Sequence, residues 1–464
     1  MSARRPVGRV LVIGLDCATP QFIFGPQRFA LPNFQRLMKA GCWGLLKSCD
    51  PPITVPAWAC MMSGKDPGTL GIYGFRNRKD HSYDAMFTAN ATSVKEPQVW
   101  DILSRCGKKV AVIGVAHTYP VRPVNGWMVS GFLAPDTYAD FTYPKELKQE
   151  LREKVGEFVL DVRDFRTDDK DRLLRDVHEF MENRFRTAEY LLQNTPWDFF
   201  MVVEMGMDRL HHGFWKYADP AHPKFMPGNP YESAMREYYA RVDDWIARLA
   251  AIVGDETAIL IVSDHGAKPM LGGICINHWL IKEGYLALKE FPTTRRRIED
   301  CAIDWSKTRV WSAGGYYGRI FVNVRGREPQ GIVAPEDYEC VRDELIRKLE
   351  TMTGPDGCLL GNRVFKPQTL YRAAKGVPPD LLVYFGDLSW RAVGLVGVDS
   401  IYTFENDTGP DDANHDHNGI FIMDDRTGRG GIELRDLNLL DVAPTLLNLF
   451  GIDPLPDMQG KVIS

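Results

Sequence analysis

The stretch Pro51-Pro52-Ile53-Thr54-Val55-Pro56-Ala57-Trp58 is the part of this chain around which the rest is organised. Each proline fixes its own φ angle and pushes the residue before it towards extended geometry. A rigid, non-helical loop is therefore expected to hold Thr54 just before an apolar segment that can begin a helix. A helix start offers unpaired N–H groups and a positive dipole end, which favour an anion. We interpret Thr54 as a nucleophile that attacks phosphorus with metal ions around it, although a threonine in a proline-rich turn is more often structural.

The composition is ordinary for a soluble globular protein, because 44% of the 464 residues are hydrophobic and 25% are charged. This length predicts two or three structural units, or one large α/β domain with insertions. The net charge of −5 lacks the excess of positive charge that binding to a nucleic-acid polymer or an anionic membrane requires. Every apolar run is shorter than the roughly 18 residues of a membrane span, so no transmembrane helix is expected.

Two features predict a cytoplasmic protein. The start of the chain runs directly into the strand-like Val10–Ile13, which is too short and too β-branched for a signal peptide. The nine cysteines have no regular spacing and form no Cys-x-x-Cys pair, which is typical of reduced thiols. The oligomeric state stays open.

Apolar strand patterns and amphipathic helix patterns alternate along the first part of the chain. The strand patterns cover Arg9–Leu15, Lys109–Val115, Trp197–Val203 and Thr257–Val262. The helix patterns between them cover Val99–Cys106, Pro144–Gly156, Arg172–Leu192 and Tyr231–Val253. This alternation predicts an α/β fold with a doubly wound, mostly parallel sheet and right-handed crossovers.

The pattern changes from about residue 272 to residue 400, where a strand over Arg319–Val324, a helix over Pro335–Leu349 and a strand over Asp380–Phe385 are expected. We interpret residues 272–400 as an inserted αβ subdomain. Residues 1–271 and 401–464 would then form the metal-binding catalytic core, to whose sheet the apolar run Gly419–Met423 returns.

Acidic residues and histidines follow the predicted core strands directly. Asp16 comes after the first strand, although an isolated Asp at this place more often caps the next helix. Asp208 and His212 are four residues apart, so on one helical turn they face the same way and can bind one ion. Asp264 and His265 follow a strand at a tight Gly turn and can point to different ions. Ligands of open α/β sheets bind at these strand ends.

Carboxylates and imidazoles without a cysteine partner are typical of a catalytic Zn²⁺ or Mn²⁺ site. Two such ions roughly 4 Å apart could hold both the attacking and the leaving oxygen of an in-line displacement. One ion would bind Thr54 and lower the pKa of its hydroxyl, which is otherwise a poor nucleophile. His211, beside His212, is interpreted as a residue on the helix surface or behind the ligands.

With these motifs the chain resembles the alkaline phosphatase superfamily. It is most similar to the branch of type I phosphodiesterases/nucleotide pyrophosphatases and predicted phosphohydrolases or phosphomutases. The matching motifs extend over nearly the whole chain, and they are Val12–Asp16, Thr54–Trp58, Ser63–Gly68, Asp208-xxx-His212, Ser263–Gly266, His415-xxx-Gly419, Asp441–Leu446 and Asp457–Gly460.

The resemblance implies an alkaline phosphatase-like fold and two metal sites. One site would contain Asp208, His212 and His415, and the other would contain Asp16, Thr54, Asp264 and His265. His415 is preferred over His417 because it has the family's distance to Gly419. The metals would be two divalent ions, Zn²⁺ before Mn²⁺. Thr54 would form a covalent phospho-enzyme, which a metal-bound water would hydrolyse.

The expected substrate is a small-molecule phosphoester. Trp58 lies near the motifs and could stack on a base or an apolar leaving group, unless it belongs to the core. Lys65 could meet additional phosphate charge, unless it is a solvated surface residue.

Two positions depart from the family pattern. Phe75 stands where nucleotide pyrophosphatases have an Asn that contacts a phosphoryl oxygen, so this contact must come from a backbone N–H after Thr54, from Arg76 or from Asn77. Leu70 stands where many relatives have a His, a change that we interpret as structural.

Two alternatives accompany the interpretation as a phosphodiesterase. In a phosphomutase or phosphotransferase, the phosphoryl group on Thr54 would pass to a second hydroxyl, and the inserted subdomain could exclude water. A non-catalytic metal-binding protein on this fold is disfavoured because every expected ligand is present. A dinucleotide-binding protein is rejected, since Gly14-Leu15-Asp16-Cys17 stands where Gly-x-Gly-x-x-Gly would be required.

Overall fold

The computed structural model describes residues 7–428 and 430–463. These residues form two compact units. The first contains the residues up to Phe75, Thr88–Ala267 and the residues from His415 onwards, and the second contains Arg76–Phe87 and Lys268–Asn414. The predicted insertion, 272–400, lies inside the second unit.

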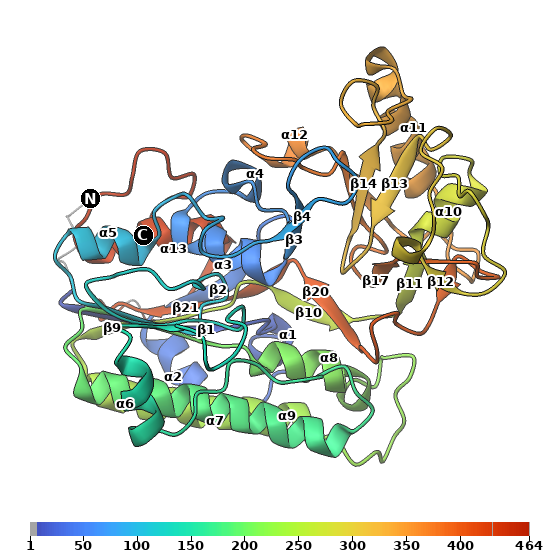
Figure 1. Cartoon of the computed structure of the whole chain (residues 1–464). Coiled ribbons are helices and arrows are strands. Elements are labelled where there is room, and N and C mark those ends of the chain that lie inside the picture. The colour runs from blue at the N-terminus through green and yellow to red at the C-terminus, as the bar shows by residue number, and fades with distance from the viewer. Residues whose placement is uncertain (1–6, 429, 464) are drawn as a thin grey trace. The chain divides into compact units, whose positions relative to one another are not determined.

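The first unit is built on a nine-stranded sheet with the strand order β22-β2-β21-β9-β1-β8-β5-β6-β7 (Figure 1). The strands in this order are β22 (Ile432–Asn438), β2 (Cys42–Lys47), β21 (Asn418–Asp424), β9 (Thr257–Val262), β1 (Arg9–Leu15), β8 (Phe199–Glu204), β5 (Val110–Ile113), β6 (Gly126–Val129) and β7 (Thr142–Tyr143). The central strands β9, β1, β8, β5 and β6 are parallel to their neighbours in this group. Strand β21 is antiparallel to both β9 and β2, and β7 is antiparallel to β6.

Helices cover both faces of this sheet, as Figure 1 shows. One face carries α2 (Pro32–Ala40), α6 (Leu147–Lys154), α7 (Lys170–Asn194), α8 (Gly206–Ala218) and α9 (Ala234–Val253). The other face carries α3 (Thr54–Ser63), α5 (Val99–Arg105) and α13 (Val442–Leu449). Short helices α1 (Pro20–Ile23) and α4 (Pro67–Leu70) follow β1 and α3. This layering confirms the predicted doubly wound α/β fold.

The central strands are apolar over their full length because helices cover both of their faces. Successive side chains of β1 point to opposite faces, and Val10 and Val12 join α3, α5 and α13 in one apolar core. In the sheet, Val12 lies opposite Met201 of β8 and Leu260 of β9. A parallel sheet buried in this way aligns the carboxyl ends of its strands at one edge.

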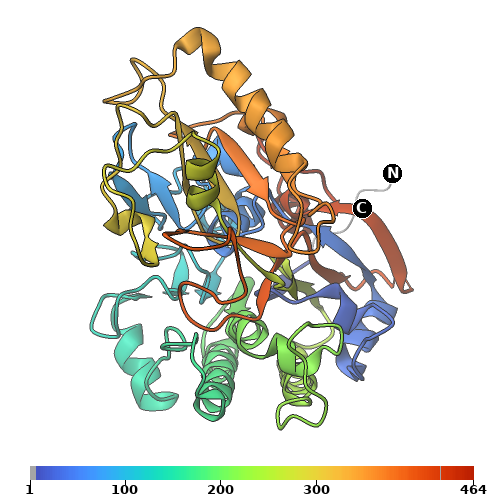
Figure 2. The same ribbon diagram turned by 90° about the vertical axis from the view of Figure 1, so that its right-hand side faces the viewer.

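The second unit has a core of its own around a four-stranded antiparallel sheet in the order β13-β14-β16-β15. Its strands are β13 (Val310–Ala313), β14 (Gly318–Val322), β16 (Leu381–Tyr384) and β15 (Arg363–Phe365). Helix α11 (Tyr338–Glu350) packs on β14 and β15, and Figure 2 shows it as the long orange helix. Helix α10 (Ile276–Lys282) packs on β13, and β11 (Gly272–Cys275) pairs with β17 (Trp390–Val393) and β19 (Tyr402–Thr403).

The second unit also contains a hairpin that the sequence analysis placed in the core. Strands β3 (Arg76–Arg78) and β4 (Met86–Thr88) form this hairpin. The buried guanidinium of Arg78 pairs with Glu328 and lies over the rings of Trp311 and Phe321. A buried ion pair and a cation–π contact of this kind attach the hairpin to the unit formed by the much later residues.

Within residues 7–428 and 430–463, none of the helices combines the length and the apolar character that crossing a bilayer requires.

A buried glutamate links β8 to the helix that follows it. Glu204 is the last residue of β8, and its carboxylate accepts hydrogen bonds from Gly206 N at 2.5 Å, Met207 N at 3.2 Å and the Tyr238 hydroxyl at 2.9 Å. It therefore caps the first N–H groups of α8. Burial nevertheless raises the pKa of Glu204 from 4.5 to about 7, against these hydrogen bonds and the nearby Arg184.

This shift predicts a pH-dependent stability. The folded state binds the Glu204 proton more tightly than the unfolded state, so this contribution is present below pH 4.5 and is lost as the pH rises towards 7. Glu204→Gln cannot ionise, so its stability relative to the natural protein should increase by roughly 3 kcal/mol across this window. Urea unfolding of both proteins at several pH values measures this difference, and a pH-independent difference would contradict the assignment.

Candidate active site

The first unit brings the predicted strand-end residues together. Asp16 follows β1, Asp208 and His212 lie in α8 after β8, and Asp264 and His265 follow β9. His415 belongs to β20 (Ala413–Asp416), immediately before β21. All six side chains are buried, and their ligand atoms form two groups in which they lie within 4.8 Å of one another.

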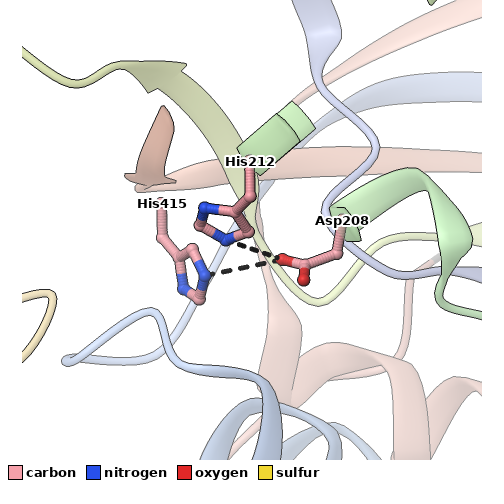
Figure 3. A group of neighbouring side chains, drawn as sticks. All are labelled: Asp208, His212 and His415. Carbon is pink, nitrogen blue, oxygen red and sulfur yellow. Dashed lines mark ion pairs between the residues drawn. The ribbon is translucent and has the colours of Figure 1, made fainter. Parts of the chain in front are cut away.

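The Asp208 cluster consists of Asp208, His212 and His415 (Figure 3). Asp208 Oδ1 lies 3.3 Å from His212 Nε2 and 3.6 Å from His415 Nε2. Both imidazoles thus direct Nε2 towards the same carboxylate oxygen, as Figure 3 shows. The four-residue spacing places Asp208 and His212 on one face of α8, as predicted, and His415 approaches from β20.

The Asp16 cluster consists of Asp16, Asp264 and His265. His265 Nε2 lies 3.2 Å from Asp264 Oδ2 and 3.8 Å from Asp16 Oδ1. Thr54 Oγ1 lies 3.3 Å from the same nitrogen, so the predicted nucleophile is next to this cluster. The ends of two strands, β1 and β9, and the start of α3 therefore supply one constellation of two carboxylates, an imidazole and a hydroxyl.

The two clusters adjoin at two stacked histidine rings. The rings of His265 and His415 are stacked with their centroids 3.9 Å apart and an angle of 16° between their planes. Each ring belongs to a different cluster. Any ions in the two clusters would therefore be close neighbours.

Hydrogen bonds to the second ring nitrogen orient these two histidines. His415 Nδ1 lies 2.8 Å from the carbonyl oxygen of Pro52, and His265 Nδ1 lies 3.0 Å from that of Gly266. A carbonyl oxygen only accepts, so each Nδ1 donates and each Nε2 carries a lone pair. This is the tautomer that a metal ligand requires.

Burial shifts the pKa of most groups in the two clusters towards the uncharged form. Burial and the nearby charge of Asp208 raise the pKa of Asp16 well above its usual value. Burial and the nearby charge of Asp16 do the same to the pKa of Asp264. Burial also lowers the pKa of His265 and of His415. The pKa of Asp208 is lowered, because its histidine neighbours and Arg209 outweigh the opposite effect of burial. A divalent cation would reverse this cost for the carboxylates.

Three carboxylate oxygens test whether the clusters suit metal ions. Asp16 Oδ1, Asp208 Oδ1 and Asp264 Oδ2 are buried and accept no hydrogen bond within the described part of the chain. Each faces the Nε2 atom of a histidine instead. A buried acceptor without a donor is costly, and carboxylate oxygen with neutral imidazole is a ligand set for Zn²⁺ or Mn²⁺. The residues present therefore fit two divalent ions.

Thr54 is the first residue of α3 rather than the end of a loop before it. The preceding residue, Ile53, has extended geometry, and its side chain provides no cap for the helix. The free N–H groups of the first turn thus begin at the predicted nucleophile. Thr54 is buried in this position, with 3% of the residue exposed.

Trp58 has a different role from the predicted contact with substrate. Its ring is fully buried, and its Nε1 donates a hydrogen bond of 2.8 Å to Asp16 Oδ2. Gly14 makes room for this ring, since a Cβ atom there would lie 2.5 Å from Trp58 Cη2. The indole therefore orients Asp16 from behind and leaves Asp16 Oδ1 for the cluster.

Lys65 is also engaged within the protein. It is buried and pairs with Glu96 at 2.5 Å and with Asp457 near the chain's end. These two ion pairs give Lys65 a structural function in the first unit. A lysine compensated in this way has little charge left to attract a phosphate.

Three other predicted residues lie outside the two clusters. His211 Nε2 lies 3.1 Å from the Tyr239 hydroxyl. His417 lies between β20 and β21 and is partly exposed. Phe75 packs edge-on against Phe132, with 5.8 Å between the ring centroids, and has no atom that could replace the amide of an asparagine.

The sequence analysis did not identify two acidic or basic neighbours of the site. Glu204 caps α8, as described above. Arg209 donates a hydrogen bond of 2.7 Å to Asp208 Oδ2 and pairs with Asp161. The run Glu204-Met205-Gly206-Met207-Asp208-Arg209 contains both residues, but only the tertiary structure pairs Arg209 with an acid 48 positions earlier.

Comparisons with known proteins identify the family of the chain. The sequence matches the family described as type I phosphodiesterase / nucleotide pyrophosphatase over residues 10–411. No curated protein sequence matches it significantly.

Solved structures of one ectonucleotide pyrophosphatase / phosphodiesterase resemble the fold. Human ectonucleotide pyrophosphatase / phosphodiesterase 5 has 14% sequence identity and a TM-score of 0.57, with 98% of this chain and 97% of that chain covered. An inactive threonine-to-alanine variant of the murine protein, in complex with AMP, has 14% identity and a TM-score of 0.56, with 97% and 96% covered. The murine protein itself has 14% identity, a TM-score of 0.55 and the same coverage.

The match to the family extends over most of the sequence, and the described residues contain two groups of side chains that could hold metal ions. The chain therefore belongs to the type I phosphodiesterase/nucleotide pyrophosphatase family of the alkaline phosphatase superfamily, and it is a metal-dependent hydrolase of phosphoric esters.

Proposed function

We propose that this hydrolase cleaves small phosphodiesters through a phospho-threonine intermediate on Thr54, with one divalent ion in each cluster. The observation that carries the proposal is the position of Thr54 Oγ1, 3.3 Å from His265 Nε2 and at the first residue of α3. A hydroxyl between a metal-ligand cluster and the N-terminus of a helix is placed to attack an anionic phosphorus centre.

The proposed ligands follow the two clusters. Asp208, His212 and His415 would hold one ion, and Asp16, Asp264, His265 and the Thr54 hydroxyl would hold the other. We expect Zn²⁺ before Mn²⁺, because three imidazoles and no cysteine belong to the two sets. Bound ions would lower the pKa of the Thr54 hydroxyl and balance charge on the phosphoryl oxygens.

The residues of the chain then act in two steps. Thr54 Oγ1 bonds to phosphorus while the bond to the leaving ester oxygen breaks, and the hydroxyl proton of Thr54 passes to that oxygen. The phosphoryl group, which keeps its other ester, stays on Thr54. Water next cleaves the bond between Thr54 and phosphorus, which restores the hydroxyl. Trp58 and the carbonyl oxygens of Pro52 and Gly266 keep Asp16, His415 and His265 in place during both steps.

A backbone N–H is our candidate for the phosphoryl contact that Phe75 cannot make. In the first turn of α3, Pro56 has no N–H and Ala57 N already donates to Ile53 O at 2.9 Å. Val55 N–H is the group next to the nucleophile that helix geometry leaves without a partner inside the helix. Together with the helix dipole, it would stabilise negative charge that develops on the phosphoryl oxygens.

The substrate class follows from the family and from one relative. The murine relative is described as inactive after a threonine-to-alanine change and as binding AMP. A nucleotide product such as AMP would be released from a diester or pyrophosphate bond. We therefore propose a nucleotide-like or other small phosphodiester as the substrate of this chain.

Thr54→Ala should abolish turnover because it removes the attacking oxygen. It should leave the fold intact because the only other group it removes is one methyl. We expect the rate of bis-p-nitrophenyl phosphate cleavage to fall by about 10³-fold or more, as it does when an enzyme loses a residue of its catalytic unit. Thr54→Ser, which keeps a hydroxyl, is the matched control and should retain measurable activity. More than a few per cent of activity in the alanine variant would exclude Thr54 as the nucleophile.

His415→Ala and His417→Ala form a second matched pair. Loss of His415 removes one of three ligands of the Asp208 cluster, so the purified protein should contain about one metal ion fewer per chain. Loss of His417, which lies two residues further on outside the cluster, should leave the metal content unchanged. Elemental analysis of both variants measures the metal content. A loss of metal in His417→Ala but not in His415→Ala would make His417 the ligand instead of His415.

The choice of ester is tested by comparing bis-p-nitrophenyl phosphate with p-nitrophenyl phosphate in metal-loaded protein. A phosphodiesterase should cleave the diester faster at equal concentration. Faster cleavage of the monoester would contradict the proposed substrate class and would leave the phosphoester hydrolase itself intact.

A further inference from the structure

Arg209 connects the Asp208 cluster to a loop outside it. The residue follows Asp208 in α8, and its Nη1 donates a hydrogen bond of 2.7 Å to Asp208 Oδ2. Its Nε and Nη2 donate to Asp161 Oδ1 and Oδ2, both at 2.9 Å. One planar guanidinium thus bridges two carboxylates, one of which belongs to the cluster.

The surroundings of Arg209 hold this bridge in one orientation. The side chain is 10% exposed, and its guanidinium carbon lies 4.4 Å from the ring centroid of Phe165 and 5.5 Å from that of Phe132. Aromatic faces near a guanidinium attract it and exclude water. The paired, parallel contacts with Asp161 fix the plane of the group as well as its position.

The two oxygens of Asp208 therefore differ. Oδ2 is occupied by Arg209, whereas Oδ1 accepts no hydrogen bond in the described residues and faces His212 Nε2 and His415 Nε2. We propose that Arg209, held by Asp161, is a positioning residue that restricts Asp208 to a single metal-binding oxygen. This inference rests on the proposed metal site of the Asp208 cluster.

Asp161 has a second effect in this arrangement. An uncompensated guanidinium beside a divalent ion would repel it, and this repulsion is strong where water is excluded. The carboxylate of Asp161 balances this charge, so Arg209 can orient Asp208 without weakening the site. The pair Arg209–Asp161 then has no net charge to repel the ion, and it still fixes the orientation of Asp208.

The inference is tested on the full chain with Co²⁺ as the probe, in the natural protein, Asp161→Asn, Arg209→Met and the double variant. Competition with a chelator gives the affinity for Co²⁺, and the binding step that disappears in His212→Ala identifies the Asp208 cluster. The visible absorption of bound Co²⁺ reports its coordination number.

Asp176→Asn is the control, because Asp176 pairs with Arg172 on α7 and its side chain is 34% exposed, compared with 29% for Asp161. Near-ultraviolet circular dichroism establishes that each variant folds.

Asp161→Asn should weaken Co²⁺ binding by about tenfold, as expected for loss of a residue behind the ligands, and Asp176→Asn should have no effect. In Arg209→Met, Asp208 can offer both oxygens, so the Co²⁺ absorption should weaken as the coordination number rises. The Asp161 effect should vanish in the double variant, because Asp161 acts only through Arg209.

Equal effects of Asp161→Asn in both backgrounds, or an unchanged Co²⁺ spectrum in Arg209→Met, would overturn the inference and leave the metal site standing. Failure of the natural protein to bind Co²⁺ at the Asp208 cluster would overturn the proposed metal site, and this inference with it.

Discussion

The site depends on one electrostatic constraint, which is the burial of three carboxylates and three imidazoles within two adjoining clusters. Charged groups are costly in such a place unless an opposite charge accompanies them. The raised pKa values of Asp16 and Asp264 and the lowered pKa values of His265 and His415 express this cost in the chain alone. A rigid parallel sheet, covered by helices on both faces, can keep these groups together because five of them follow the ends of the adjacent strands β1, β8 and β9 and the sixth, His415, lies just before β21. The same arrangement that is unfavourable without a cation becomes a strong binding site with one.

The sequence was sufficient to predict most of this constellation, for a simple physical reason. A buried parallel strand is a continuous apolar run, and its end is visible as the first polar residues after it, as at Asp16 and at Ser263-Asp264. Parallel strands that share a sheet bring these ends to one edge, so no knowledge of long-range contacts is needed to expect them together. The fold class followed from the same alternation of strands and helices. His415 is different, since it lies just before β21, which is antiparallel to β9, and only resemblance to the family selected it over His417.

The features that could not be predicted depend on contacts between distant parts of the chain. Asp161 and Arg209 are 48 positions apart, and Arg78 and Glu328 are 250 apart, so no local periodicity connects either pair. Trp58 and Lys65 look like substrate contacts beside the motif, yet Trp58 supports Asp16 and Lys65 pairs with Glu96. A long side chain near a catalytic motif can equally well lie behind it, and only packing decides. Gly14 is the residue in the sequence related to this packing, because its lack of a side chain leaves the space that the Trp58 ring fills.

The two proposed sites differ in charge, and this difference suits their tasks. The Asp16 cluster has two carboxylates for one imidazole, and its partners Trp58 Nε1 and Cys17 N are neutral donors. The Asp208 cluster has one carboxylate for two imidazoles, and one oxygen of that carboxylate accepts a hydrogen bond from Arg209. An ion beside Thr54 would therefore meet the greater negative charge and be held more firmly. An ion in the Asp208 cluster would keep more of its own positive charge, which is then available to a phosphoryl oxygen. Asymmetry of this kind would let one ion stay with the proposed nucleophile while the other draws electron density from the substrate.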